Sequence, residues 1–352
     1  MFKPIRLLII TQKMNAQDSV LGFFVGWVSE LAKHFPEIIV ICLEKGEYDL
    51  PTNVRVLSLG KEEKQPRFQY LWRFCKYLWQ ERGNYDAVFV HMNQEYVLLA
   101  GWWWRLWGKT VGLWRNHHAG SWLTNLAVFF CHQVFCTSKY SYTARFKKTK
   151  LMPVGVDLTS FKPNPTAAKQ SRSIIFLGRL SPVKKQKMFI EALIRLRHAG
   201  EKFNATIVGD YLPADRDYHD QLVRLIEEND LTDQIKILSG VPHAETIRFY
   251  QTNEWAVNLS SSGMYDKIIF EALACGTPIL ATNQNLVGLL DERLVINEPT
   301  VEDLAARLKL LLNSDDATRT GFINQAQKLA DANSLAKLAA TLHHAYQHLL
   351  NR

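Results

Sequence analysis

Acidic side chains are missing from a long stretch in the first half of the sequence. Asp and Glu do not occur between Tyr96 and Val156, whereas eight Lys and Arg residues do. Residues 1–165 hold 21 Lys and Arg against 12 Asp and Glu, so the net charge of +8 belongs to this part of the chain. Such asymmetry is typical of proteins that meet a membrane, nucleic acid or a phosphorylated substrate, although solubility alone also accounts for it.

Cysteines and long apolar runs are also scarce. The five cysteines are scattered and lack paired metal-ligand spacing, so they indicate neither a disulfide framework nor a zinc site. The opening MFKPIRLLIITQKM contains an apolar run that is too short to cross a bilayer, and it lacks the small-residue cleavage site of a signal peptide. We therefore expect a cytoplasmic globular protein whose first apolar run is a buried strand.

Short apolar runs alternate with amphipathic segments along the chain. This pattern is typical of parallel sheets that helices cover on both faces, so it predicts an α/β fold. The predicted strands are Ile5–Thr11, Ile38–Leu43, Val54–Leu59, Ala87–His91, Val111–Trp114, Val134–Ser138, Ser173–Leu177, Ala205–Val208, Ile235–Leu238, Trp255–Leu259 and Ile279–Ala281.

The polar segment 157–173 carries two prolines and predicts a linker between two such units. We expect an N-terminal domain over residues 1–160 and a C-terminal domain over residues 161–333. Residues 334–352 predict a final helix that packs back on the first domain. Two doubly wound domains would face a ligand cleft lined by loops from the carboxyl ends of their strands.

Three segments of the second domain fall at strand ends and carry binding chemistry. In FLGRLSPVK, a glycine turn is followed by Arg179 and Lys184, two cations suited to a diphosphate, although solvated surface charges would look the same. In SSSGMYDKIIFEALACGTPILA, Glu271 lies on a short helix behind a small-residue loop and suits ribose hydroxyls, unless it is an exposed helix residue. The turn at Gly240, Val241 and Pro242 suits the edge of a base.

Together with the glycine turn of PVGVDLTSFKP (residues 153–163), these segments resemble glycosyltransferase family 4 along nearly the whole chain. GRLSPVK is similar to the family's phosphate-binding segment, and FEALACGTPILA is similar to its donor-site segment. The resemblance implies the GT-B fold with two Rossmann-like domains, in which residues 1–160 form the acceptor-side domain and residues 161–333 the nucleotide-sugar-binding domain. It also implies that Arg179 and Lys184 hold the donor diphosphate, that Glu271 binds the ribose, and that Gly240 and Val241 border the base.

In the first domain the resemblance is looser. It matches Gly22 to a glycine that lets a loop approach the donor, and His117 to a catalytic histidine that faces the sugar, with His118 as the neighbouring alternative. His91 and Asn93 end another strand and are expected on the acceptor side. Each histidine alone is more often structural than catalytic.

The sequence departs from the family pattern around the donor loop. Gly263 stands where many members have a glutamate, and we expect Met264, Asp266 and Lys267 to supply donor contacts there. Lys185 stands where a glycine is common, and the segment 283–294 replaces the usual Gly-Gly and Glu stretch.

The resemblance thus implies a retaining, metal-independent transferase without cofactors, which moves a hexose-type sugar from a UDP- or GDP-sugar to a hydroxyl acceptor on a glycan or a lipid. The acidic pair Asp215 and Asp217 lies in a polar loop, and we interpret it as solvated surface rather than as a metal site. The alternatives are a non-catalytic nucleotide-sugar-binding relative, an epimerase or phosphorylase on the same fold, and a nucleic-acid-binding protein for which no recognition motif is present.

Aromatic and basic residues interleave in FQYLWRFCKYLW (residues 68–79), and tryptophans cluster again between Trp102 and Trp122. Aromatic rings with basic neighbours suit the headgroup region of a membrane, although large aromatics also fill cores. We expect a peripheral protein on the anionic inner face of the plasma membrane, and no nucleic acid as partner.

Overall fold

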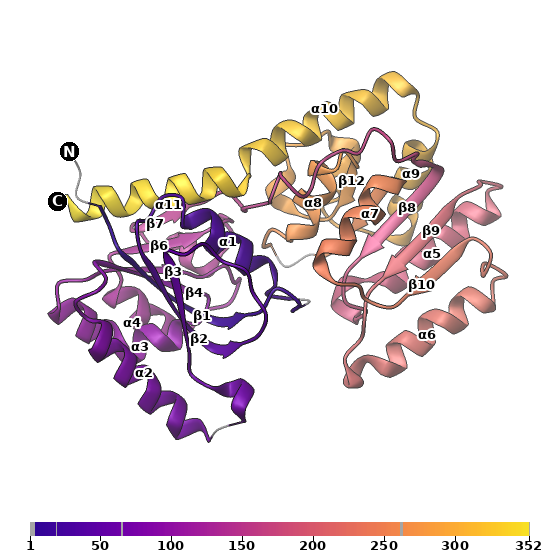
Figure 1. The fold of residues 1–352 in the computed structure, drawn as a ribbon. Helices are drawn as coiled ribbons and strands as arrows, with labels where there is room; N and C mark the ends of the chain where they lie inside the picture. Colours follow the sequence, from indigo (N-terminus) through magenta and orange to yellow (C-terminus); the bar gives the residue numbers. More distant parts are fainter. Residues whose placement is uncertain (1–3, 19, 65, 261–262, 352) are drawn as a thin grey trace. The chain divides into compact units, whose positions relative to one another are not determined.

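The computed structural model describes residues 4–18, 20–64, 66–260 and 263–351 (Figure 1). The chain divides into two compact units. Unit 1 consists of residues 1–155 together with 335–352, and unit 2 consists of residues 156–334. The observed division thus lies five residues before the predicted boundary at residues 160 and 161, and the last helix belongs with unit 1.

Unit 1 is built on a seven-stranded parallel sheet with the order β3-β2-β1-β4-β5-β6-β7. Its strands are β1 (Leu7–Met14), β2 (Ile38–Lys45), β3 (Val54–Ser58), β4 (Ala87–His91), β5 (Thr110–Trp114), β6 (Gln133–Cys136) and β7 (Thr149–Leu151). Its helices are α1 (Phe23–Leu31), α2 (Arg67–Glu81), α3 (Gln94–Leu106), α4 (Trp122–Phe130) and α11 (Leu335–Leu350).

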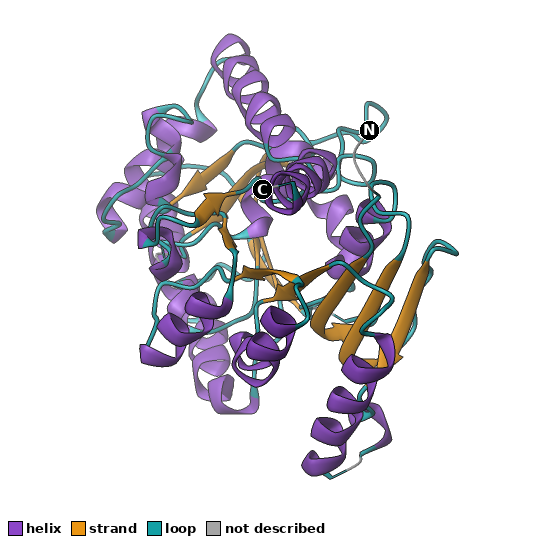
Figure 2. Cartoon of the chain, turned by 90° about the vertical axis from the view of Figure 1, so that its left-hand side faces the viewer, coloured by secondary structure: helices purple, strands orange, loops and turns teal. Residues whose placement is uncertain are grey.

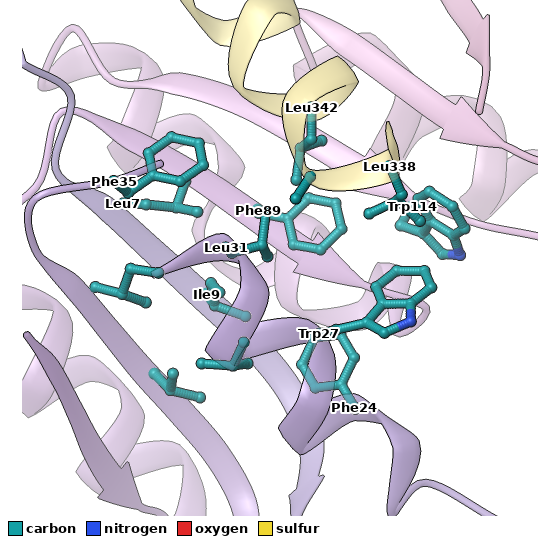
Figure 3. Packing of buried hydrophobic residues seen from close by; sticks show 14 of the residues in the cluster. Leu7, Ile9, Phe24, Trp27, Leu31, Phe35, Phe89, Trp114, Leu338 and Leu342 are labelled. Carbon is teal, nitrogen blue, oxygen red and sulfur yellow. The ribbon is translucent and has the colours of Figure 1, made fainter. Parts of the chain in front are cut away.

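Successive side chains of the central strands point alternately into two separate cores, one on each face of this sheet. Leu7 and Ile9 point into the core that α1 and α11 cover, and Figure 3 shows Leu338 and Leu342 of α11 packed there. Leu8 and Ile10 point into the opposite core, which α2, α3 and α4 cover. Helix α11 is therefore part of the fold of unit 1, although it is the last element of the chain.

Unit 2 is built on a five-stranded parallel sheet with the order β10-β9-β8-β11-β12. Its strands are β8 (Gln170–Leu177), β9 (Asn204–Val208), β10 (Ile235–Leu238), β11 (Asn253–Asn258) and β12 (Ile279–Ala281). Its helices are α5 (Gln186–His198), α6 (Arg216–Glu227), α7 (Thr246–Thr252), α8 (Lys267–Ala274), α9 (Val301–Leu312) and α10 (Asp316–Ala332). Figure 2 shows the chain coloured by secondary structure, with the strands lying among the helices.

The predicted fold class is confirmed, since both sheets are parallel and every predicted strand overlaps an observed one. Two details differ. The edge strand β7 was not predicted, and the last residues of the predicted linker form the start of β8. None of the helices in the described residues is long and apolar enough to span a bilayer.

Candidate active site

The first site segment of unit 2 is the loop that follows β8. Gly178 has a φ of 143°, which favours glycine, and its N–H donates to the carbonyl of Val208 at 3.0 Å. A Cβ on Gly209 would lie 2.0 Å from the carbonyl oxygen of Gly178, so glycine is required there as well. The loops after β8 and β9 therefore touch at the carboxyl edge of the sheet. The side chain of Arg179 is exposed from this edge.

Lys184 ends a 3₁₀ turn (Pro182–Lys184) just before α5. Its Nζ lies 2.6 Å from Oδ2 of Asp266 and donates to Oγ of Ser260 at 3.0 Å. The same Asp266 oxygen accepts a hydrogen bond from Nδ2 of Asn258 at 3.2 Å. The loops after β8 and β11 and the first turn of α8 thus meet around one ammonium group.

Asp266 is also the N-cap of α8 and accepts from the N–H of Ile268. Burial by itself would raise the pKa of this carboxyl, but the charge of Lys184 and the hydrogen bonds from Lys184, Asn258 and Ile268 together outweigh burial and hold the pKa below its usual value. Asp266 is therefore an anion that fixes the position of Lys184 in the ligand-free protein.

Glu271 lies in the middle of α8 and is only 5% exposed. Its Oε1 lies 2.8 Å from Nε2 of His243, which follows directly on the turn at Gly240, Val241 and Pro242. The ring of His243 in turn packs against Phe161, with 5.2 Å between the ring centroids. A residue of the glycosyltransferase-like linker segment thus supports the histidine that holds the carboxylate.

The turn before His243 is anchored at its first residue. The N–H of Gly240 donates to Oδ1 of Asp210 at 2.8 Å, and a Cβ on Gly240 would lie 2.5 Å from Oδ2 of the same carboxylate. A side chain at this position would therefore displace the Asp210 carboxylate that holds the turn, and the neighbouring Val241 is partly exposed. Gly240, Val241 and Glu271 were predicted as donor-site residues, whereas His243, two residues after Val241, was not.

Lys267 is the first residue of α8 and lies four residues before Glu271. Burial lowers the pKa of this lysine to about 7, and the negative charges of Glu271 and Asp157 only partly oppose the shift. An anion that approached Lys267 would therefore favour uptake of a proton by its amine.

The loop before α8 is held by the segment that replaces the usual family stretch. Gly263 has a φ of 72°, and its carbonyl accepts from Nδ2 of Asn285 at 2.8 Å. Met264 is buried, and its carbonyl accepts from Nδ2 of Asn283 at 2.7 Å. The adjoining Ser261 and Ser262, which the sequence analysis assigned to the same loop, lie outside the described residues.

In unit 1, Gly22 is the N-cap of α1. A Cβ at this position would lie 2.5 Å from the carbonyl oxygen of Asp18 and 2.7 Å from that of Ala16. The glycine therefore lets the preceding loop fold tightly over the first turn of the helix.

His117 and His118 follow β5 and are both exposed, with their rings stacked at 4.5 Å. Nδ1 of His117 lies 3.0 Å from both the backbone nitrogen and the carbonyl oxygen of Ala119, so it accepts from the first or donates to the second, depending on the tautomer. In either tautomer Ala119 contacts Nδ1, and Nε2 is the ring atom that can act toward a ligand.

The structure corrects the expectation for His91. This residue does end β4, but it is 2% exposed and stacks on Phe24 with 4.0 Å between ring centroids. Its Nδ1 lies 3.3 Å from Oγ1 of Thr11. His91 is therefore part of the aromatic core on one face of the sheet rather than an acceptor-facing group. Its neighbour Asn93 is partly exposed at the N-cap of α3.

In the described part of the chain, no three His, Cys, Asp or Glu residues form a group that could hold a metal ion. An open depression of about 550 Å³ lies elsewhere in unit 2, against α10. It is lined by Asp291, Arg293, Thr318, Gly321, Phe322, Asn324, Gln325 and Lys328, and it shares no residue with the strand-end cluster.

Comparison with known proteins finds similar sequences among glycosyltransferases. Residues 159–329, most of unit 2, match the model of the family described as glycosyl transferases group 1. The chain is also 26% identical over 214 residues to a D-inositol 3-phosphate glycosyltransferase of Kineococcus radiotolerans. The aligned segment covers 54% of this chain and 49% of that protein. The chain thus spans about half the length, or less, of the curated relatives it matches.

Solved structures match nearly the whole chain. Anabaena Alr3699/HepE in complex with UDP superposes with a TM-score of 0.79 at 18% identity, over 98% of this chain and 100% of that one. Its complex with UDP-glucose gives a TM-score of 0.76 at 19% identity, with coverage of 98% and 100%. The chain therefore has the GT-B fold, and its residues 159–329 match the model of the glycosyl transferases group 1 family.

Proposed function

We propose that this protein is a glycosyltransferase that takes a hexose-type sugar from a nucleoside-diphosphate sugar and passes it to a hydroxyl acceptor. The observation that carries the proposal is the convergence of Lys184, Asp266, Glu271 and His243 at the carboxyl edge of the sheet in unit 2. Ligands of open α/β sheets bind at this edge. The family match of residues 159–329 supports the same assignment.

Lys184 and Arg179 are the proposed partners of the donor diphosphate. Lys184 lies at the start of α5, where the helix dipole also favours negative charge, and Asp266 already fixes its ammonium group in place. Arg179 is exposed one residue after Gly178 and is free to turn toward a ligand. As the bond between sugar and phosphate breaks, negative charge grows on the leaving diphosphate, and these cations would stabilise it in the transition state.

Glu271 is the proposed ribose ligand. A carboxylate can accept hydrogen bonds from two neighbouring hydroxyl groups, and the bond from His243 holds this one in a fixed orientation. The base would lie along the turn at Gly240 and Val241. Gly263, Met264 and Lys267 would complete the donor contacts.

We propose a retaining reaction that needs no metal ion and no cofactor, in which the cations and helix N-terminus supply the charge stabilisation. The acceptor oxygen would attack from the face that the diphosphate leaves, with His117 acting toward the sugar through Nε2. His118 and Asn93 would lie on the acceptor side. The donor is proposed to be a UDP-sugar, because structures of the same fold hold UDP and UDP-glucose.

The experiment is a donor-turnover assay with UDP-glucose, other UDP-sugars and GDP-sugars, in the presence of a mixture of glycan and lipid acceptors. Release of nucleoside diphosphate together with a glycosylated product supports transfer. Tight donor binding without release would favour a non-catalytic relative, and interconversion of donor sugars without acceptor would favour an epimerase. Activity should persist in EDTA. Complete loss that magnesium restores would refute the metal-free reaction.

A further inference from the structure

Large apolar side chains are exposed along α2, α3 and α4 of unit 1. Phe68 is 70% exposed, and Trp122 and Phe129 are each 71% exposed. The exposed apolar residues of these helices are Phe68, Leu71, Trp72, Trp79, Leu99, Trp102, Leu106, Trp122, Leu123, Leu126 and Phe129. We call this set the aromatic face.

Core packing does not account for the aromatic face. The inner sides of the same helices already fill the core with other residues, among them Phe74, Leu78, Trp104 and Val128. A helix that covers a sheet normally turns a polar side to water, and exposed apolar patches of this kind mark binding surfaces.

The three helices pack on the same face of the sheet (Figure 1). The rings of Trp79 on α2 and Trp107 directly after α3 are in contact, with centroids 6.1 Å apart. A Cβ on Gly101 of α3 would lie 2.7 Å from Cβ of Phe130 at the end of α4. The small residue therefore lets these two helices pack closely.

Cationic side chains lie against two of these rings. Nζ of Lys76 lies 5.0 Å from the ring centroid of Trp72, and the guanidinium of Arg82 lies 4.2 Å from that of Trp79. Arg67, Arg105 and Lys109 add further basic groups in or next to the same helices.

Negative charge on these helices is limited to two residues. Glu81 is buried and paired with Arg55, so Glu95 is the exposed acid. An apolar surface with this excess of cations is complementary to a layer of anionic headgroups over hydrocarbon.

We infer that unit 1 docks peripherally on anionic membranes through the aromatic face. The rings would enter the boundary between headgroups and acyl chains, and the neighbouring lysine and arginine side chains would contact lipid phosphates. A second copy of the chain suits the surface less well, because self-pairing would bring like charges together. This inference goes beyond the proposed function and does not depend on it.

Co-sedimentation of the full chain with vesicles tests the inference. Binding should be strong to vesicles of phosphatidylcholine with phosphatidylserine at low salt. It should fall in high salt and be weak to phosphatidylcholine alone. The triple variant Trp72→Ser/Trp122→Ser/Phe129→Ser should bind about tenfold less or weaker still, because it removes three rings from the interface.

Matched controls come from unit 2. Leu212→Ser/Leu238→Ser also removes exposed apolar side chains and should leave vesicle binding unchanged. Lys76→Glu should weaken binding to anionic vesicles, whereas Lys328→Glu, at an exposed position on α10, should not. Thermal unfolding of each variant checks that it remains folded.

Three results would overturn the inference. The wild-type chain could stay in the supernatant with anionic vesicles at low salt, or the triple variant could bind as well as the wild type. The third is that the wild-type chain is a dimer in analytical ultracentrifugation and the triple variant is a monomer, which would identify a second copy of the chain as the partner of the aromatic face.

Discussion

Replacing Lys184 by alanine should both lower the stability of the fold and weaken binding of the donor diphosphate. In the ligand-free protein Lys184 neutralises Asp266 at 2.6 Å, so the alanine variant leaves a largely desolvated carboxylate without its cation. Losing one hydrogen bond between charged groups costs about 1.5–3 kcal/mol. We expect a loss of about that size in the free energy of unfolding, lower than for a fully buried pair because both side chains keep some contact with water.

The pH dependence of this loss has a definite sign. The pKa of Asp266 is lowered in the folded protein, so the ion pair stabilises the fold above the usual aspartate value of about 3.9 and loses its effect as the pH falls through the folded pKa. The stability difference between wild type and Lys184→Ala should therefore be full at neutral pH and shrink in acid. Chemical denaturation at several pH values measures it.

A second change distinguishes the two roles. Asp266→Asn in the Lys184→Ala background removes the stranded charge and should restore most of the stability. It should not restore nucleotide binding, which we expect to be about tenfold to a hundredfold weaker than in Asp266→Asn alone, because the contact with the diphosphate is lost.

Calorimetric titration of UDP into each variant is the assay. Lys187→Ala is the matched control, because this lysine lies one turn away on α5, at 4.0 Å from Glu191 on the surface, and should change little. If the double variant bound UDP as tightly as Asp266→Asn, Lys184 would be a structural residue and the diphosphate assignment would be wrong.

Further predictions concern the rest of the donor site. Glu271→Gln should weaken free UDP and UDP-sugar by similar factors, and His243→Ala should do so to a smaller extent; calorimetry that finds only the sugar nucleotide affected would refute the ribose role. Because the pKa of Lys267 is about 7, its amine is mostly neutral at about pH 8, and binding of an anionic donor should take up a proton there. Binding enthalpies that vary with the ionisation enthalpy of the buffer, and cease to vary in Lys267→Met, would show this uptake; no variation in the wild type would exclude it. Lys185 has a φ of 60°, so Lys185→Gly should keep or raise the unfolding free energy by up to about 1 kcal/mol, whereas Lys185→Val should lower it. Equal melting temperatures of the two variants would contradict that reasoning.

Most of the fold could be predicted because its strands are continuous apolar runs between amphipathic segments. The central strands β1, β4 and β5 are buried along nearly their whole length, so their sequences are apolar on both faces. Strand β7 escaped prediction because it consists of only three residues, Thr149 to Leu151, at the edge of the sheet. Such a short, polar strand depends on its neighbour β6 for its conformation and not on local sequence.

The site could be predicted only as far as its residues follow one another in recognisable segments. Arg179, Lys184 and Glu271 lie in such segments, and their roles stay predictions. The pairs between Lys184 and Asp266 and between His243 and Glu271 join segments that are 82 and 28 residues apart, so no local pattern contains them. Their formation depends on how the strand ends are arranged in the sheet.

The expectation that His91 faces the acceptor failed because the local sequence is ambiguous. A histidine directly after an apolar strand has the same local sequence whether it faces a ligand or lies in the core. The stack on Phe24, from an element 67 residues earlier, places it in the core, and only the tertiary structure contains that contact.

Titration of UDP, GDP and ADP into the full chain determines whether unit 2 binds a nucleoside diphosphate at the strand ends where Lys184 and Glu271 lie. We predict saturable binding of one molecule per chain for UDP. It should be accompanied by about 2.7 kcal/mol of added stability at a hundredfold excess over the dissociation constant, and weakened in Lys184→Ala and Glu271→Gln. If none of the three nucleotides bound, or if UDP bound equally to both variants, the account of this site would be contradicted.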